Sequence, residues 1–290
     1  MTVTTGDIKN LREITGAGIL DCKKALQETG GDVDQAIEFL RKKGLASASK
    51  KADREANEGV VSAQISDDGK SGVLLEVNCE TDFVARTEDF QTFVDTLVQQ
   101  VVAQPALTSV EALLQAPYAG NTANTVAQQL TEAVAKLGEN MMVRRLARFS
   151  LEGEGMLDSY IHTGGRVGVL VEIAGSSGNN DQMAELVHDL ALQIAAVAPR
   201  YVTEQDVPAE AVEAEREIYK AQLANDSKPD NIKERIVEGK LKKWYSEIVL
   251  VNQEFVKDSG LTVAQLVQQH NKNSGGNIRI RQFARFELGA

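Results

Sequence analysis

The sequence contains an internal repeat, and this repeat restricts the possible folds more than any other feature. Two strand-like segments of each copy align at a constant offset of 96 residues: 58-EGVVSAQI-65 and 73-VLLEV-77 match 154-EGMLDSYI-161 and 169-VLVEI-173. The copies also close alike, with 147-ARFSLEG-153 matching 284-ARFELG-289. Because each copy of such a repeat is one structural unit, the chain is expected to contain two units of the same architecture.

Each unit is predicted to be a β-hairpin covered by a helix. In the first unit, 59-GVVSAQI-65 and 73-VLLEVNC-79 flank a turn-forming segment, 66-SDDGKSG-72, which is a hairpin signal. Residues 88–103 then carry an apolar stripe at helical spacing that must cover the hairpin. At the offset of 96, four residues of this stripe pair with apolar residues of the second copy: Phe90, Val94, Val98 and Val101 with Leu186, Leu190, Ile194 and Val197. A further helix at 125–137 and a strand at 141–149 complete the first unit.

The second unit closes later than the first because it contains an insertion. Its closing strand is predicted at 277-NIRIRQFARFEL-288. Between Val207 and Tyr245 the chain is rich in Glu, Ala, Lys and Gln, and this segment is interrupted by 225-NDSKPD-230. Two antiparallel helices around that turn are expected. Hairpins with covering helices give an α+β fold class.

The first 45 residues are predicted to form three short helices. Ile8, Leu11 and Ile14 share one face, and a break follows at residues 16–18, Gly-Ala-Gly. A second helix ends at Gly30-Gly31, and a third begins after Asp32 and stops at Gly44. Residues 46–58 lack a hydrophobic period, which is typical of a linker or of a lone solvated helix.

These patterns divide the chain into a three-helix domain and two core subdomains. With 290 residues of which 42% are hydrophobic, the chain can bury two or three cores. The predicted divisions are a helical domain at 1–45, a linker at 46–58, core subdomain 1 at 59–153, and core subdomain 2 at 154–290 with the helical hairpin at 207–245.

The net charge, the apolar runs and the first ten residues restrict the kinds of partner and the location that are expected. A net charge of −11 argues against direct binding of nucleic acid, which requires a basic surface. No apolar run approaches the roughly 18–20 residues of a membrane span, and the first ten residues, MTVTTGDIKN, lack the regions of an export signal. Cys22 and Cys79 do not have the spacing of a zinc or redox site. We therefore expect a cytoplasmic protein.

The residue patterns that support catalysis are missing. The segment 69-GKS-71 lacks the earlier glycine of a phosphate-binding loop and lies in a hairpin turn. Neither the histidines nor any serine or cysteine shows the spacing of a metal site or a nucleophilic pair. His162 differs from the other histidines in its position. It follows a strand directly before the 163-TGG-165 turn, where its side chain can face a partner. We expect a binding protein and not an enzyme, with no cofactor, no metal and no small-molecule substrate.

The segment 79-CETDFVAR-86 is the best candidate for a binding site. It places Phe83 beside Asp82 in a connecting loop, where small polar residues are usual. Phe83 either packs under its own sheet or enters a pocket of a partner. At the offset of 96, 81-TDFV-84 falls on residues 177–180, Ser-Gly-Asn-Asn, which include no aromatic residue. The architecture therefore does not require Phe83, and the comparison favours the partner-binding interpretation.

Four segments resemble the bacterial elongation factor Ts family: 11-LREITGAGILDCKKAL-26, 79-CETDFVAR-86, 165-GRVGVLVE-172 and 237-VEGKLKKW-244. The resemblance covers nearly the whole chain, and the four motifs occur in the family's order. It implies an N-terminal domain similar to the ubiquitin-associated three-helix domain, two related core subdomains, and a helical coiled-coil hairpin inserted in the second. The activity that it implies is guanine-nucleotide exchange on elongation factor Tu, the GTPase that delivers aminoacyl-tRNA.

The resemblance also assigns roles to individual residues. It implies that the loop of Thr81, Asp82, Phe83 and Val84 enters the GTPase domain and dislodges its magnesium ion. The N-terminal domain would bind the GTPase domain through Leu11, Arg12, Gly16, Ala17 and Gly18. The second subdomain, including His162, would contact a distal domain of the partner. The 207–245 hairpin is either a partner contact or scaffold, and 174-AGSSGNNDQ-182 departs from the family pattern.

Two other classes of function compete with this assignment. A ubiquitin-like binding adaptor would use the first 45 residues alone, with the core as a passive attachment; the Phe83 asymmetry between the repeats disfavours it. An enzyme with a site between the repeats would require converging polar residues with shifted pKa values, and the sequence does not indicate them.

Overall fold

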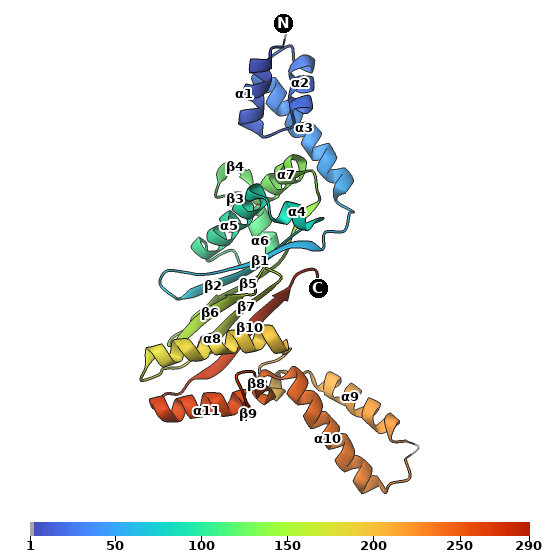
Figure 1. Cartoon of the computed structure of the whole chain (residues 1–290), viewed down its shortest axis with the longest axis vertical. Helices are drawn as coiled ribbons and strands as arrows, with labels where there is room; N and C mark the ends of the chain where they lie inside the picture. Colours follow the sequence, from blue (N-terminus) through green and yellow to red (C-terminus); the bar gives the residue numbers. More distant parts are fainter. Residues whose placement is uncertain (1–2, 225) are drawn as a thin grey trace.

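The computed structural model of the protein describes residues 3–224 and 226–290. Along the longest axis lie the N-terminal helices, two sheets with their covering helices, and a projecting helical hairpin (Figure 1). Helices precede and cover sheets that are antiparallel, so the predicted α+β class is confirmed.

The two repeat units form two sheets with the same strand order. In the first sheet, β2 (Ser71–Cys79) lies between β1 (Glu58–Ile65) and β5 (Met141–Ser150). In the second sheet, β7 (Val167–Ala174) lies between β6 (Gly155–Ile161) and β10 (Arg279–Glu287). All neighbours are antiparallel. The second strand of each predicted hairpin is therefore the central strand of its sheet, and the repeat is confirmed.

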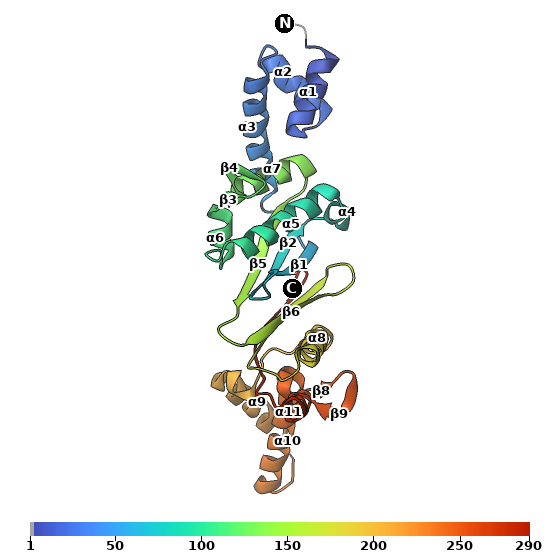
Figure 2. The ribbon, with the colours of Figure 1, turned by 90° about the vertical axis from the view of Figure 1, so that its left-hand side faces the viewer.

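The sheets pack face to face, and helices cover their outer faces (Figures 1 and 2). On the inner side, Leu74 of β2 and Leu170 of β7 belong to one buried cluster. On the outer sides, α5 (Glu88–Ala103) and α7 (Val126–Leu137) cover the first sheet, while α8 (Asn180–Val197) and α11 (Val263–Ser274) cover the second. Both faces of β2 and β7 are buried, which explains their nearly continuous apolar sequences.

The pairing of the covering helices predicted at offset 96 is wrong, because the true offset is 93. The buried residues of the two helices correspond at that offset: Phe90, Phe93, Val94, Leu97, Val98, Gln100 and Val101 in α5, and Met183, Leu186, Val187, Leu190, Ala191, Gln193 and Ile194 in α8. An apolar stripe nearly repeats after three residues, so periodicity alone could not fix the alignment. The second unit is therefore three residues shorter between its central strand and its helix.

The side chains of Gln100 and Gln193 have the same structural role. Gln100 donates to the carbonyl of Pro117 and accepts from the N–H of Ala119, both at 2.8 Å. Gln193 makes the matching pair of bonds in the second unit. Each amide thus holds a small hairpin that sequence reasoning missed: β3 (Pro117–Tyr118) with β4 (Asn121–Thr125), and β8 (Glu254–Phe255) with β9 (Asp258–Thr262). A short helix, α6 (Val110–Gln115), precedes the first of them.

The N-terminal helices are α1 (Thr5–Thr15), α2 (Ile19–Glu28) and α3 (Val33–Lys51). The predicted end of the third helix at Gly44 is wrong, since α3 continues into the expected linker. Gly44 faces α7, where an added Cβ would lie 3.0 Å from the Cβ of Ala135. Close packing therefore explains this glycine, which does not end the helix. Ile14, predicted to share a face with Ile8 and Leu11, is 56% exposed, whereas Leu11 is fully buried.

The insertion in the second unit forms the helices α9 (Ala209–Gln222) and α10 (Asp230–Ile248), which project from the core as an antiparallel pair (Figure 1). The predicted turn at 225–230 includes residue 225, which lies outside the described residues. At the base of the pair, Val207, Ile248 and Val249 form a separate buried cluster. Short 3₁₀ helices at Glu204–Asp206 and Leu250–Asn252 connect the pair to the second unit.

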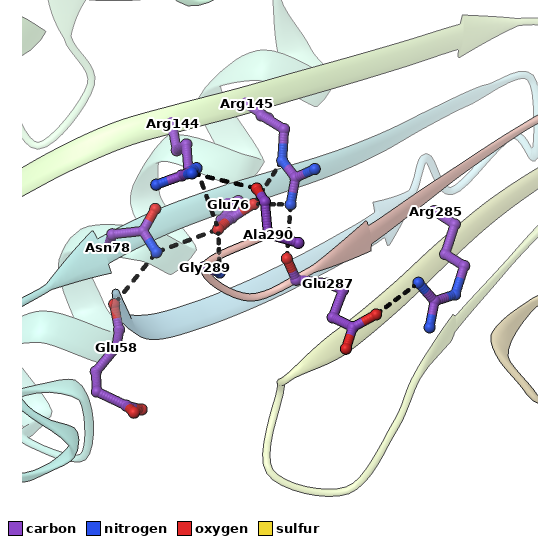
Figure 3. Close-up of polar contacts among 9 residues, drawn as sticks. All are labelled: Glu58, Glu76, Asn78, Arg144, Arg145, Arg285, Glu287, Gly289 and Ala290. Atoms are coloured by element: carbon purple, nitrogen blue, oxygen red, sulfur yellow. Dashed lines mark hydrogen bonds and ion pairs between the residues drawn. The ribbon is translucent and has the colours of Figure 1, made fainter. Parts of the chain in front are cut away.

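The C-terminal segment joins the two sheets through Glu76 (Figure 3). Glu76 is fully buried at the centre of β2, and its carboxylate accepts from Arg145 Nε at 2.6 Å and from the N–H of Gly289 at 3.1 Å. Arg145 also donates to the carbonyl of Glu287 at 2.7 Å and lies 4.6 Å from the ring centroid of Phe286. One arginine of the first sheet thus contacts the last strand of the second.

We predict that Glu76→Ala lowers the free energy of unfolding by about 2–4 kcal/mol, because it leaves Arg145 and the Gly289 N–H without their buried acceptor. Urea unfolding followed by circular dichroism measures this change. Glu152→Ala, which removes an exposed carboxylate from the connection between β5 and β6, is the control and should change stability by under about 1 kcal/mol. Equal unfolding midpoints for the two variants would contradict the prediction.

Candidate partner-binding loop

The segment between β2 and α5 forms a short helix, α4 (Asp82–Ala85), that has no counterpart in the second unit. Thr81 caps α4, with its hydroxyl accepting from the N–H of Val84 at 3.3 Å. Seven residues, 80–86, separate β2 from the Thr87 cap of α5. Four residues, 175–178, separate β7 from the Asn179 cap of α8. The first unit therefore carries an insertion at the place where the predicted loop lies.

Phe83 points away from the protein core. It is 80% exposed, whereas Ala85 is buried and Val84 packs partly against the first core. The alternative that Phe83 packs under its own sheet is therefore contradicted. A single exposed apolar side chain is ordinary, but this one is a phenylalanine at the tip of an inserted and anchored helix. That combination is typical of a contact residue.

The polar residues of the loop are fixed to different degrees. Asp82 pairs with Arg86 at 2.8 Å, and both side chains are largely exposed, so the pair contributes little to stability and is free to exchange partners. Thr81 is held more firmly, because its N–H and hydroxyl both donate to Glu139, at 2.9 and 2.6 Å.

A buried cysteine, Cys79, stabilises the loop through a hydrogen bond. The Cys79 thiol donates to the carbonyl of Thr81 at 3.1 Å. Burial and then the nearby Glu139 carboxylate raise the pKa of Cys79 to about 12, so the group is an uncharged thiol at neutral pH. Cys79 is therefore a structural residue, because the reactive form of cysteine is the thiolate.

The N-terminal candidates divide into core and surface residues. Leu11 is fully buried with Cys22 and Leu26, so its role is structural and it is not available as a contact. Arg12, Gly16 and Gly18 are exposed, and Ala17 is half-buried. Sequence reasoning missed the apolar surface around this turn, which consists of three exposed side chains: Ile14, Ile19 and Leu20, with Leu20 80% exposed. The spacing of these three residues in the sequence could not predict this apolar surface, since residues beside a helix break have no defined face.

His162 is exposed at the turn between β6 and β7. Its Nδ1 lies 2.9 Å from the hydroxyl of Tyr160. His188 of α8 lies next to this pair and contacts Asp158 at 2.9 Å. Two histidines therefore mark this surface of the second unit.

The structure brings the three predicted regions to one side of the molecule (Figure 2). Helix α4 packs beside β1, and the β6–β7 turn does the same, with the N–H of Val61 donating to the Gly165 carbonyl at 2.8 Å. The turn at Gly16 lies against Lys136, which pairs with Asp89 of α5 at 2.7 Å. One partner surface can therefore contact all three regions.

Other parts of the described chain offer weaker candidates for a functional site. A cavity of about 270 Å³ lies between α9 and α10, next to Arg216, Lys220 and Val237, and none of the predicted site residues lines it. Within residues 3–224 and 226–290, no group of three His, Cys, Asp or Glu side chains is arranged to hold a metal ion. In the same residues, no helix has both the length and the apolar character to cross a membrane.

We predict that Phe83→Ala changes the free energy of unfolding by less than about 0.5 kcal/mol, because the side chain is already exposed. Phe90→Ala is the matched control, since Phe90 is fully buried in α5 and its loss should cost about 3–5 kcal/mol. Urea unfolding of both variants measures the difference. A similar loss in the two variants would show that Phe83 belongs to the core.

Known proteins resemble the chain along its whole length. The family model described as elongation factor TS matches residues 80–290. The chain is 45% identical over all of its length, and over 93% of the relative, to elongation factor Ts of Trichlorobacter lovleyi. It is 47% identical over 99% of its length to that of Clostridium perfringens, and 46% identical over all of its length to that of Nitratiruptor sp., covering 93% and 94% of these relatives. This chain belongs to the elongation factor Ts family.

Proposed function

We propose that this protein is a cytoplasmic guanine-nucleotide exchange factor of translation. It binds the GDP form of elongation factor Tu and promotes GDP release so that GTP can bind. The observation that carries the proposal is the exposed Phe83 on α4, an anchored helix that only the first unit possesses. Membership of the elongation factor Ts family supplies the partner. The protein acts by binding and catalyses no chemical step of its own.

The residues 81–84 displace the magnesium ion of the GTPase. A nucleotide held with nanomolar affinity and an on-rate of about 10⁶ M⁻¹s⁻¹ leaves at only about 10⁻³ s⁻¹. Magnesium bridges phosphate oxygens and protein in such sites, so a shift of its ligands weakens the binding of both ion and nucleotide. Phe83 provides an apolar wedge that shifts the ligands of the magnesium ion. Asp82 provides a carboxylate for polar contacts beside the wedge.

Binding of the factor and of the nucleotide are coupled. If the bound factor lowers the affinity of the GTPase for nucleotide, nucleotide lowers the affinity for the factor by the same ratio. Entry of GTP therefore releases the factor. Because Thr81 and Val84 hold α4 in place, little free energy is needed to order the wedge when the complex forms.

Two further surfaces bind the partner outside the wedge. The first consists of Arg12 and the Gly16–Gly18 turn, with Ile14, Ile19 and Leu20 as its exposed apolar part. Leu11 supports this surface from within. The second surface includes His162 and contacts a distal domain of the partner. The backbone turns that carry these residues lie on the same side of the molecule as α4 (Figure 2), so all three regions can bind together.

The N-terminal helices and the two core subdomains are separate folding units in this proposal.

We predict that Phe83→Ala lowers the rate at which the factor accelerates GDP release by about tenfold or more, because the wedge is lost while the fold stays intact. Release of fluorescent GDP from purified elongation factor Tu measures the rate. Val256→Ala, which truncates an exposed apolar residue of the second unit, is the control and should match the wild-type protein. Equal acceleration by Phe83→Ala would move the exchange step to other contacts.

Deletion of residues 1–51 is predicted to weaken binding of elongation factor Tu at least tenfold without unfolding the remainder, because it removes one surface and leaves both sheets complete. Isothermal titration calorimetry measures the affinity, and circular dichroism of the shortened chain is the control for its fold. An unchanged affinity would exclude the N-terminal surface from the complex.

A further inference from the structure

The loop that presents Phe83 depends on a carboxylate far away in the sequence. Glu139 lies in the turn between α7 and β5, directly after Gly138, which ends α7 with a φ of +84°. Its Oε2 accepts from the Thr81 N–H at 2.9 Å, and its Oε1 accepts from the Thr81 hydroxyl at 2.6 Å. One carboxylate therefore binds both hydrogen-bond donors of the residue that caps α4.

These two bonds determine how Thr81 can act as a cap. With its proton directed to Glu139, the Thr81 hydroxyl offers a lone pair to the Val84 N–H. Bonds to an ionised carboxylate are about twice as strong as bonds between neutral groups. Helix α4 has only four residues, and a helix of that length is not stable without outside contacts. The conformation of α4 thus depends strongly on Glu139.

The turn that carries Glu139 is itself fixed by its neighbours. Asn140 is buried, and its side-chain amide donates to the carbonyls of Ala52 and Arg54 at 3.3 and 2.7 Å. Its backbone N–H donates to Glu80 at 2.6 Å, and Arg54 pairs with the same carboxylate at 3.3 Å. The chain after α3, the start of the loop and the α7–β5 turn are therefore held together, which gives Glu139 a defined position.

The second repeat unit is a natural comparison that lacks both α4 and the carboxylate. The caps Gly138 and Gly275 are equivalent, so Glu139 corresponds to Gly276, and Asn140 corresponds to Asn277. Asn277 is kept as a hydrogen-bonding residue and accepts from the N–H of Ser176 at 2.8 Å.

A side chain at position 276 has no room in the second unit. An added Cβ would lie 2.5 Å from the carbonyl oxygen of Ser176 in the shorter loop. The backbone of the short loop thus excludes a side chain at the position that corresponds to Glu139. Helix α4 and the carboxylate occur together in one unit and are absent together in the other, although the surrounding scaffold is the same.

We propose that Glu139 is the positioning residue of α4: it holds Thr81 by two hydrogen bonds and so fixes the direction in which Phe83 leaves the protein. Its importance for nucleotide release rests on the proposed exchange function. Its effect on the order of α4 does not, and the two can be measured separately.

The first experiment measures the order of α4 in the free, full-length protein. Glu139→Ala should increase hydrogen exchange of the amides at 81 and 84–86 by about tenfold, the change that corresponds to ~1.4 kcal/mol. It should also narrow the fluorine NMR signal of 4-fluorophenylalanine at position 83. Glu139→Gln keeps one acceptor oxygen and should give an intermediate result. Asp95→Asn, which alters an exposed carboxylate of α5, should match the wild type.

The second experiment measures GDP release from elongation factor Tu with the same proteins. Acceleration should fall about tenfold for Glu139→Ala and less for Glu139→Gln. The double variant Thr81→Val/Glu139→Ala should lose much less than the sum of the two single variants, because both changes remove the same bond. Additive losses would show that the two residues act independently and would overturn the proposal.

The outcomes separate the positioning role from the proposed function. Unchanged hydrogen exchange and an unchanged fluorine signal in Glu139→Ala overturn the positioning role. A mobile α4 with wild-type acceleration of GDP release overturns the importance of that positioning for exchange. If the wild-type protein does not accelerate release, the exchange function is wrong, and the hydrogen-exchange result still decides whether Glu139 orders α4. Should Glu139→Ala fail to fold, the Glu139→Gln variant decides both experiments.

Discussion

The burial of β2 and β7 on both faces is the constraint on which the rest of the structure depends. Each central strand packs one face on helices and the other on the opposite sheet. A strand buried in this way has no access to water, so neighbouring strands must supply its hydrogen bonds. The partners β5 and β10 come from late in each unit. The chain must therefore return to the sheet, whatever is inserted before it returns, and the helical hairpin α9–α10 is tolerated for this reason.

The same burial explains a pair of polar residues in the core. Glu76 and Glu172 occupy equivalent positions in β2 and β7, and both are almost completely buried. Each receives an arginine from the closing strand of its sheet: Arg145 bonds Glu76, and Arg281 bonds Glu172 at 3.1 Å. A buried carboxylate without a partner is strongly destabilising, and in each sheet the closing strand supplies the arginine that pairs with it. Glu76 also accepts from the N–H of Gly289, which follows β10 of the other unit (Figure 3), and this bond links the two units.

Because the scaffold is duplicated, the differences between the units show what was added to it. The first unit carries α4 with Phe83 and Glu139, and the second carries the hairpin α9–α10. Helix α4 begins three residues after a strand that is buried on both faces, so its base cannot shift easily. In the exchange step that we propose, the wedge has to be more rigid than the elements that it moves, and a loop anchored on the core satisfies this condition. The structural asymmetry of the repeat thus lies at the loop that we propose to act on the partner.

The sequence by itself determined the repeat, the two hairpins, the helical insertion and the unusual position of Phe83, because these follow from local turn residues and from hydrophobic period. It gave the wrong offset for α5 and α8, since a helical stripe nearly repeats after three residues, and it placed Leu11 among the contacts although the residue is buried. Only the tertiary structure decided that Phe83 is exposed and that Glu139 holds Thr81, 58 residues away in the sequence. Contacts between distant residues depend on how the elements pack, and no local pattern records that packing.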